Sequence, residues 1–217
     1  MSNEGENNIS LKDIQNYINS GSQKEYSWYQ RVTLTIPTEE GTASGSSVMK
    51  ITWSENSPRI NNAPWVPQIT GEMPFVRLPD GKYVFALMGN GIDNLPSRFL
   101  IDGLDVNQWV SESHLKKISQ LKTKKSICGN NSLMPLLVEF SDVKLPHSIS
   151  EYSNNNICIN IEQVGKRDIN IGSIDNLMPW LSTLSTTKMK SSPTAFDIDN
   201  NNRKRTYVAL RRDFLRE

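Results

Sequence analysis

The sequence predicts an α+β, mostly β protein. We expect antiparallel hairpins that form a sandwich or a curled sheet, with one amphipathic helix packed on it. Three observations lead to this fold class: a Pro79-Asp80-Gly81 turn between two apolar runs, a period of two within residues 26–53, and a helical stripe in Val106–Leu121. Turn residues between such runs are typical of hairpins, and apolar positions three and four residues apart are typical of a surface helix.

The hairpin within Gly71–Gly89 is expected to organise the rest of the chain. In its turn, proline fixes φ, aspartate bonds the backbone ahead of it, and glycine takes the left-handed conformation. Its second strand, Tyr83–Met88, is apolar at successive positions and therefore on both faces. A strand with one solvated face would alternate with polar residues, so we predict that this ribbon is central and covered twice.

A second hairpin is predicted upstream, where one face of the first strand is apolar and the other polar. Residues 37–45 are expected to form its loop, and Val48–Trp53 its returning strand. The apolar positions of the first strand are Trp28, Val32, Leu34 and Ile36. Three prolines in 57–69 predict that this segment has no regular element and that Trp65 pins it against the core.

Further elements follow the central hairpin. Leu133–Phe140 is predicted as a strand, and its Pro135 favours an edge position or a bulge. Asn155–Val164 alternates isoleucine with polar residues and is also a predicted strand. Leu177–Leu181 is a short apolar cluster around Pro179-Trp180.

These patterns divide the chain into three parts. Residues 1–20 are an N-terminal tail with a short helix, 21–181 are a single β-rich domain, and 182–217 are a polar linker with a basic C-terminal segment. The chain has 217 residues and balances 24 Lys+Arg against 23 Asp+Glu. No global field therefore steers it toward nucleic acid or a membrane surface.

The sequence leaves the compartment open. No apolar run reaches the ~20 residues that span a bilayer. The polar, acidic start differs from a signal peptide, so the protein either stays in the cytoplasm or has lost an export signal. Cys128 and Cys158 can form one disulfide in an oxidising compartment, and their spacing is not that of a metal site or a redox motif.

No residue pattern predicts a catalytic, cofactor or metal site. His114 and His147 lack neighbours at ligand spacing and are interpreted as solvated. The GTASGSS segment, 41–47, precedes a strand and lacks the ending of a phosphate-binding loop. Glu39, Glu40, Asp80 and Asp93 fall at turns, where acidic residues are expected without any catalytic role.

Two groups of residues are candidates for partner binding. Trp65 and Trp180 lie beside prolines in expected loops, whereas the other tryptophans fall on inward strand or helix positions. The C-terminal basic residues flank apolar ones, and as a helix they would suit an anionic membrane or a nucleic acid. The alternative is a helix or strand docked on its own domain with solvated arginines. These basic residues are Arg203, Lys204, Arg205, Arg211 and Arg212.

Four stretches resemble an uncharacterised bacterial family of small exported or lipid-anchored proteins. They are QRVTLTIPTEEGTASGSSVMK, GEMPFVRLPDGKYVFALM, LMPLLVEFSDV and the LMPWL ending, within residues 30–181. The family pattern has a TPEG turn, an SGSSV strand, a GEAVxVDLPDGRxLFALL hairpin and a PLLVxFxD strand before LPWL. Arg77 departs from it, because the family tends to an acid there. The resemblance implies one β-rich unit and a place in the periplasm or cell envelope, and no catalytic residue.

Three hypotheses about function follow. The first is a non-enzymatic interaction or accessory protein of the bacterial cell envelope, which binds a protein partner through a loop or a sheet edge. The second is a peripheral binder of anionic surfaces, membrane or nucleic acid, through the basic C-terminal segment. The third is a hydrolase that uses loop carboxylates, which would need two acids of opposed pKa in one pocket.

Overall fold

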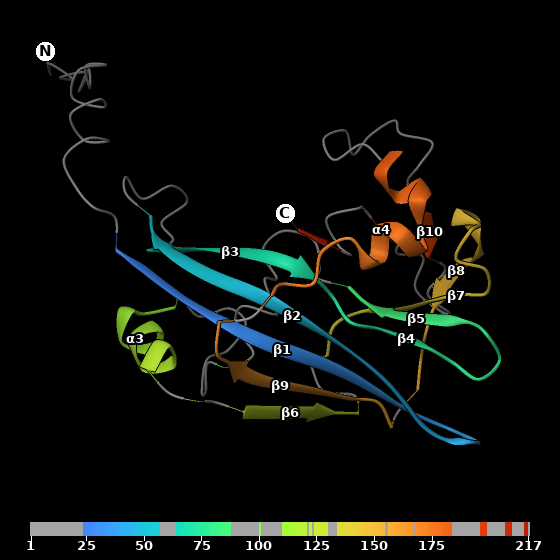
Figure 1. Cartoon of the computed structure of the whole chain (residues 1–217), viewed down its shortest axis with the longest axis horizontal. Helices are drawn as coiled ribbons and strands as arrows, with labels where there is room; N and C mark the ends of the chain where they lie inside the picture. Colours follow the sequence, from blue (N-terminus) through green and yellow to red (C-terminus); the bar gives the residue numbers. More distant parts are fainter. Residues whose placement is uncertain are drawn as a thin grey trace, which may run out of the picture.

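The computed structural model contains two main antiparallel sheets and a two-stranded ribbon, which confirms the mostly β, α+β class. A long hairpin crosses the molecule from end to end (Figure 1). The structure describes residues 24–56, 64–87, 100, 110–120, 122, 124–129, 134–154, 156–166, 168–183, 196–198, 207–209 and 215–216.

The long hairpin pairs β1 (Glu25–Thr38) with β2 (Gly41–Glu55). The predicted alternation is confirmed, because Trp28, Val32 and Leu34 are buried on one face. The predicted loop at 37–45 is wrong: the connection is the two-residue turn Glu39-Glu40, and pairing continues to Thr38 and Gly41. Gly41 has φ +126°, a value that glycine reaches without steric cost. The small residues of this segment therefore pair as strand.

The first sheet has six strands in the order β12-β3-β2-β1-β9-β6. Its further members are β3 (Trp65–Glu72), β6 (Lys124–Cys128), β9 (Cys158–Val164) and β12 (Leu215–Arg216). The expectation of no regular element in 57–69 is wrong for β3, which contains Pro67. Among the described strands, β12 pairs with the outer side of β3 at Gly71 and Glu72 alone. Beside Pro67 that side of β3 is therefore an edge, and the missing N–H of proline is tolerated there. Residues 57–63 lie outside the described part.

The second sheet has the order β4-β5-β7-β8. It is formed by β4 (Phe75–Arg77), β5 (Tyr83–Ala86), β7 (Leu137–Phe140) and β8 (Ile149–Glu151), which follows the short 3-10 helix η2 (Pro146–Ser148). The central hairpin is confirmed as β4–β5. Coverage on both faces holds for β5 and extends to β4, where Val76 is buried and Phe75 is half-buried. The predicted central position is wrong for β4, which is an edge strand of this sheet. The edge predicted for the Pro135 strand is also wrong, because the strand starts after that proline and lies between β5 and β8.

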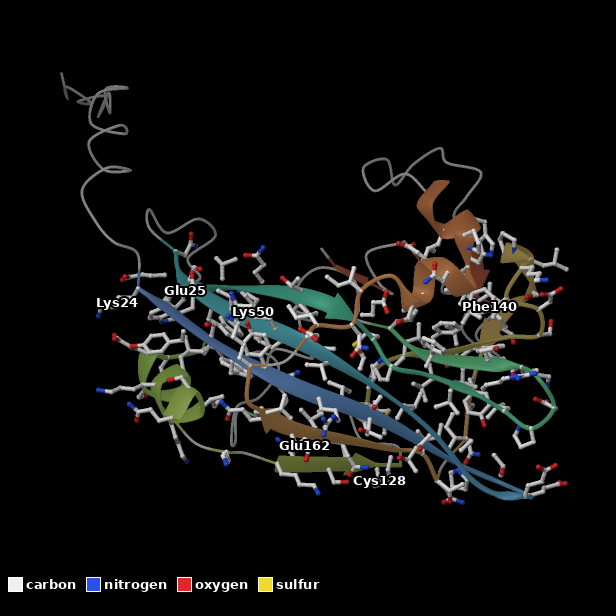
Figure 2. All side chains as sticks on the ribbon, in the orientation of Figure 1. Lys24, Glu25, Lys50, Cys128, Phe140 and Glu162 are labelled. Carbon is white, nitrogen blue, oxygen red and sulfur yellow. A yellow bond between two sulfur atoms is a disulfide. The ribbon has the colours of Figure 1, made fainter. Side chains whose placement is uncertain are left out.

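The two sheets and a helical segment form three layers (Figure 1). One core cluster joins the inner face of the six-stranded sheet to Val84 and Ala86 of β5. A second cluster joins the opposite face of β5, through Phe85 and Leu87, to α4 (Ser173–Leu177) and the 3-10 helix η3 (Pro179–Thr183). Phe140 of β7 lies beneath this helical segment (Figure 2). Strand β5 is thus buried on both faces, as its sequence predicts.

The amphipathic helix is α3 (Glu112–Gln120), which buries Leu115 and Ile118 against the first core. It is shorter than the predicted Val106–Leu121. Ser111 explains the start, because its Oγ accepts a hydrogen bond from the His114 N–H at 3.4 Å and caps the first turn. Residues 106–109 and 121, like the short N-terminal helix in 1–20, lie outside the described part.

Two polar side chains fasten distant parts of the chain to the strands. The Asn170 Oδ1 accepts a hydrogen bond from the Val48 N–H at 2.6 Å, and the Asn170 N–H donates to the Val48 carbonyl at 3.0 Å. Glu72 is 1% exposed, and its Oε1 accepts from the N–H groups of Gly172 and Ile174 at 2.5 and 3.2 Å. These contacts fix the α4 layer against β2 and β3.

Candidate functional site

A concave site lies at the tips of the two hairpins, which emerge side by side at one end of the molecule (Figure 1). It is an open cleft of about 450 Å³. This volume lies in the range of ~300–1,000 Å³ that is usual for ligand sites. The lining residues are Thr38, Glu40, Thr42, Ala43, Arg77, Leu78 and Pro79.

The β4–β5 side of this cleft is a tightly bonded turn. The Leu78 N–H donates to the Lys82 carbonyl at 2.8 Å, and the Gly81 N–H donates to the Leu78 carbonyl at 3.0 Å. Asp80 Oδ1 accepts from the Lys82 N–H at 3.1 Å, as the sequence predicts for an aspartate in this turn. This bond, together with the Lys82 ammonium, lowers the pKa of Asp80. The turn therefore presents Pro79 and Leu78 in a fixed position.

The two hairpins are held together where β4 crosses β2. At Gly45 a Cβ atom would lie 1.8 Å from the Phe75 carbonyl oxygen and 3.5 Å from a methyl group of Val76. Glycine is thus required by the closeness of the two backbones. The cleft forms just beyond this crossing, and its shape depends on it.

The chemistry of the cleft is mixed. Arg77 supplies an exposed guanidinium that pairs with no described residue, and Glu40 supplies the one carboxylate among the lining residues. Thr38 and Thr42 add hydroxyl groups, and Thr38 Oγ1 donates to the Gly41 carbonyl at 3.2 Å. Such a surface can bind a polar chain segment that carries charge. No sequence motif marks this set, because its members meet only through the close approach of two hairpins.

A second feature lies at the β6 edge of the six-stranded sheet (Figure 2). Cys128 and Cys158 form a disulfide between directly opposed positions of β6 and β9. Farther along the same outer face, Arg31 of β1 forms an ion pair with Glu162 of β9. The disulfide joins β9 to β6, and the ion pair joins β9 to β1. The possible disulfide, which the sequence left open, is therefore present.

A third feature is a polar cluster that attaches α3 to the start of β1. Lys24 Nζ lies 3.1 and 3.2 Å from the two Glu112 carboxylate oxygens, and the Tyr26 hydroxyl donates to Glu112 Oε1 at 2.9 Å. The hydrogen bonds from Lys24 and then Tyr26 lower the pKa of Glu112. The same contacts raise the pKa of Lys24 and of Tyr26.

This cluster predicts a pH dependence that can be measured at one carboxyl. A depressed pKa in the folded state stabilises the fold above the unfolded pKa, and that contribution disappears as pH falls through the folded pKa. We expect Lys24→Met and Tyr26→Phe each to raise the pKa of Glu112, with the larger rise in Lys24→Met. Carboxyl ¹³C NMR titration of the three proteins checks this, and an unchanged Glu112 titration in both variants would contradict it.

The two tryptophans predicted as partner-binding residues have different surroundings. Trp65 is in β3 and 7% exposed, with its ring 5.5 Å from that of Tyr26. Its burial leaves little surface for a partner. Trp180 is half-buried in η3, and its Nε1 donates to the Val143 carbonyl at 2.7 Å. Its ring also packs beside Phe140. Partner binding by either remains a prediction.

The other predicted groups are partly outside the described chain. Arg203, Lys204, Arg205, Arg211 and Arg212 all lie there, as does Asp93. The described neighbours Tyr207–Ala209 and Leu215–Arg216 are the strands β11 and β12, so the helical stripe proposed for this segment is wrong at these positions. Strand β11 pairs with β10 (Phe196–Ile198), and β12 docks on β3. Backbone pairing takes precedence over the helical period here.

Among the described residues, no group of three or more His, Cys, Asp or Glu side chains could hold a metal ion. Of the two histidines, His114 is half-buried, and its Nδ1 lies 3.0 Å from the Ser111 Oγ. Within the same part of the chain, no helix is long and apolar enough to cross a membrane.

Comparison with known proteins gave no relative for this chain: no protein-family model, no curated protein and no solved structure matches it.

Proposed function

We propose that this protein is a non-enzymatic accessory protein of the bacterial cell envelope and that it binds a protein partner in the cleft between its two hairpin tips. The cleft is the observation that carries the proposal. It brings the Arg77 guanidinium, which pairs with no residue that the structure describes, into one lining with Glu40 and the hydroxyls of Thr38 and Thr42. Its ligand is a polar, extended segment of the partner with an acidic side chain for Arg77.

The chemistry of the lining residues supports a peptide ligand. Arginine can hold a carboxylate through two parallel hydrogen bonds, which gives both energy and direction. Threonine hydroxyls donate to and accept from backbone groups. Ala43 and Leu78 pack against the first core, which anchors this part of the lining.

The cysteine pairing supports the proposed location. Disulfides persist in secreted and periplasmic proteins and are rare in the cytosol. The resemblance of residues 30–181 to small exported or lipid-anchored proteins points to the same compartment. Recovery of the tagged protein in the periplasmic or envelope fraction of the source bacterium, with both cysteines blocked to alkylation, would support this location. Recovery in the cytosol with free thiols would contradict it.

Site-specific crosslinking tests the binding site. A photoreactive residue at position 42 should capture a partner in the source cells, and the same residue at position 126, on the far sheet edge, should not. The captured protein is then purified and its affinity measured by calorimetry. We expect Arg77→Glu to weaken binding at least tenfold, because it replaces the guanidinium by a carboxylate that repels the acidic side chain of the partner.

Lys124→Glu is the matched control for this experiment. Lys124 is also an exposed cation, but it lies on β6 and away from the cleft residues. The same charge reversal there should leave the affinity unchanged. Equal binding by wild type and Arg77→Glu, or an equal loss in both variants, would refute the cleft as the binding site.

A further inference from the structure

The disulfide occupies a special position in the sheet. Cys128 and Cys158 are directly opposed, with their Cα atoms 4.2 Å apart. The next residues, Gly129 and Ile157, are joined by a hydrogen bond from N–H to carbonyl of 2.9 Å. Since hydrogen-bonded and non-hydrogen-bonded pairs alternate along an antiparallel ladder, the cysteines form a non-hydrogen-bonded pair. Their side chains therefore leave the same face of the sheet side by side.

Solvent reaches this bond directly. Cys128 is exposed and Cys158 half-buried, and the side chain next to them on β6, Ser126, is a small exposed hydroxyl. Figure 2 labels Cys128 at the lower margin of the molecule, where β6 ends. We therefore expect a thiolate to reach the Cys128 sulfur without unfolding of the protein. Exposed disulfides of this kind are the ones that exchange.

Besides the disulfide, β6 is held mainly by its ladder with β9. It is a five-residue strand at the end of the sheet order, paired with β9 alone among the described strands. Ile127 is the one residue of β6 that is fully buried, at 3% exposed. An edge strand with one buried side chain depends strongly on a covalent tie to its neighbour.

We propose that the Cys128–Cys158 disulfide is a thiol–disulfide exchange site for a dithiol reductant and that its reduction releases β6 from β9. A thiolate of the reductant attacks Cys128 Sγ; the bond between Cys128 and Cys158 breaks, and Cys158 leaves as a thiolate. The second thiol of the reductant loses its proton and attacks the first sulfur, which releases Cys128. The two cysteines gain two electrons and two protons, and the reductant leaves as a disulfide.

Release of β6 changes the surface of the sheet. Strand β9 then presents unpaired N–H and carbonyl groups along its free edge, with Ile159 and Ile161 on the inner face. The reduced protein is therefore a conformationally distinct form of the same chain. This inference concerns the chain alone and does not depend on the partner proposed for the cleft.

The rate of reduction tests access to the disulfide. Purified oxidised protein is treated with increasing dithiothreitol at neutral pH without denaturant, and free thiols are alkylated and counted by mass spectrometry. For an exchange site, we expect a rate proportional to the dithiothreitol concentration. A rate that levels off at the rate of global unfolding, measured separately in denaturant jumps, would overturn the proposal.

Hydrogen exchange tests the release of β6. We expect the Lys124–Cys128 amides to exchange at least tenfold faster in the reduced protein and in a Cys128→Ser/Cys158→Ser variant than in the oxidised protein. The amides of the β1–β2 hairpin should stay protected in all three, which shows that the fold persists. Unchanged exchange in β6 after reduction would overturn the proposed release.

Discussion

Gly45→Ala is expected to destabilise the protein by about 3 kcal/mol, because the added methyl group has no room. Its Cβ would lie 1.8 Å from the Phe75 carbonyl oxygen and 2.8 Å from the carbonyl carbon, and both atoms belong to backbone. Backbone cannot rotate away as a flexible side chain can, so β4 must shift away from β2. Urea denaturation followed by tryptophan fluorescence gives the change in the free energy of unfolding.

Gly165→Ala is the matched control for this substitution. It adds the same methyl group at an exposed position where no atom lies within 4 Å of the new Cβ. Its free energy of unfolding should stay within about 0.5 kcal/mol of wild type. A similar small effect of Gly45→Ala would mean that β2 and β4 do not cross as closely as described, and the cleft beyond the crossing would lose its structural basis.

Glu72→Ala is expected to cost about 3 kcal/mol, because it leaves the buried Ile174 N–H and the part-buried Gly172 N–H without their acceptor. In the native protein the Glu72 carboxylate accepts both hydrogen bonds at the start of α4, a hundred residues later in the chain. Without it, the α4–η3 layer loses its attachment to β3. The same urea denaturation measures the loss. Hydrogen exchange should show the Asn176 amide of α4 and the Met178 amide, which follows the helix, opening first.

Glu72→Gln separates the charge of the side chain from its role as a hydrogen-bond acceptor, because glutamine fills the same space. Its amide oxygen can still accept from Gly172 and Ile174, but without the charge that strengthens such bonds. We expect it to lose less than half as much stability as Glu72→Ala. Equal losses in the two variants would show that the carboxylate charge, and not the presence of an acceptor, holds α4.

The candidate site shows where sequence reasoning stops. Arg77 and Glu40 fall in two different hairpins, and nothing in their spacing indicates that they line one cleft. Pro79-Asp80-Gly81 predicts its turn because each residue has a local backbone role. The contact of that turn with the β1–β2 tip joins segments far apart in the sequence. Gly45 makes the contact sterically possible, but its presence does not predict the contact. A glycine in a strand pattern was the one available signal of a close backbone approach.

The extents of β2 and β3 also depend on contacts between segments far apart in the sequence. Residues 41–47 have the composition of a loop, yet they pair with β1 because the neighbouring strand offers hydrogen bonds along the whole length. Pro67 is compatible with β3 because no described strand pairs with it on the outer side there. In both places, tertiary pairing took precedence over local propensity.

The sequence by itself determined which residues of β1 and β9 are inward, because the period of an extended chain fixes the two faces before a strand has a partner. Only the tertiary structure decided which strands became neighbours, that Cys128 lies opposite Cys158, and that two hairpin tips line an open cleft. Side-chain alternation is a property of a few consecutive residues, whereas strand order depends on contacts between segments far apart in the chain.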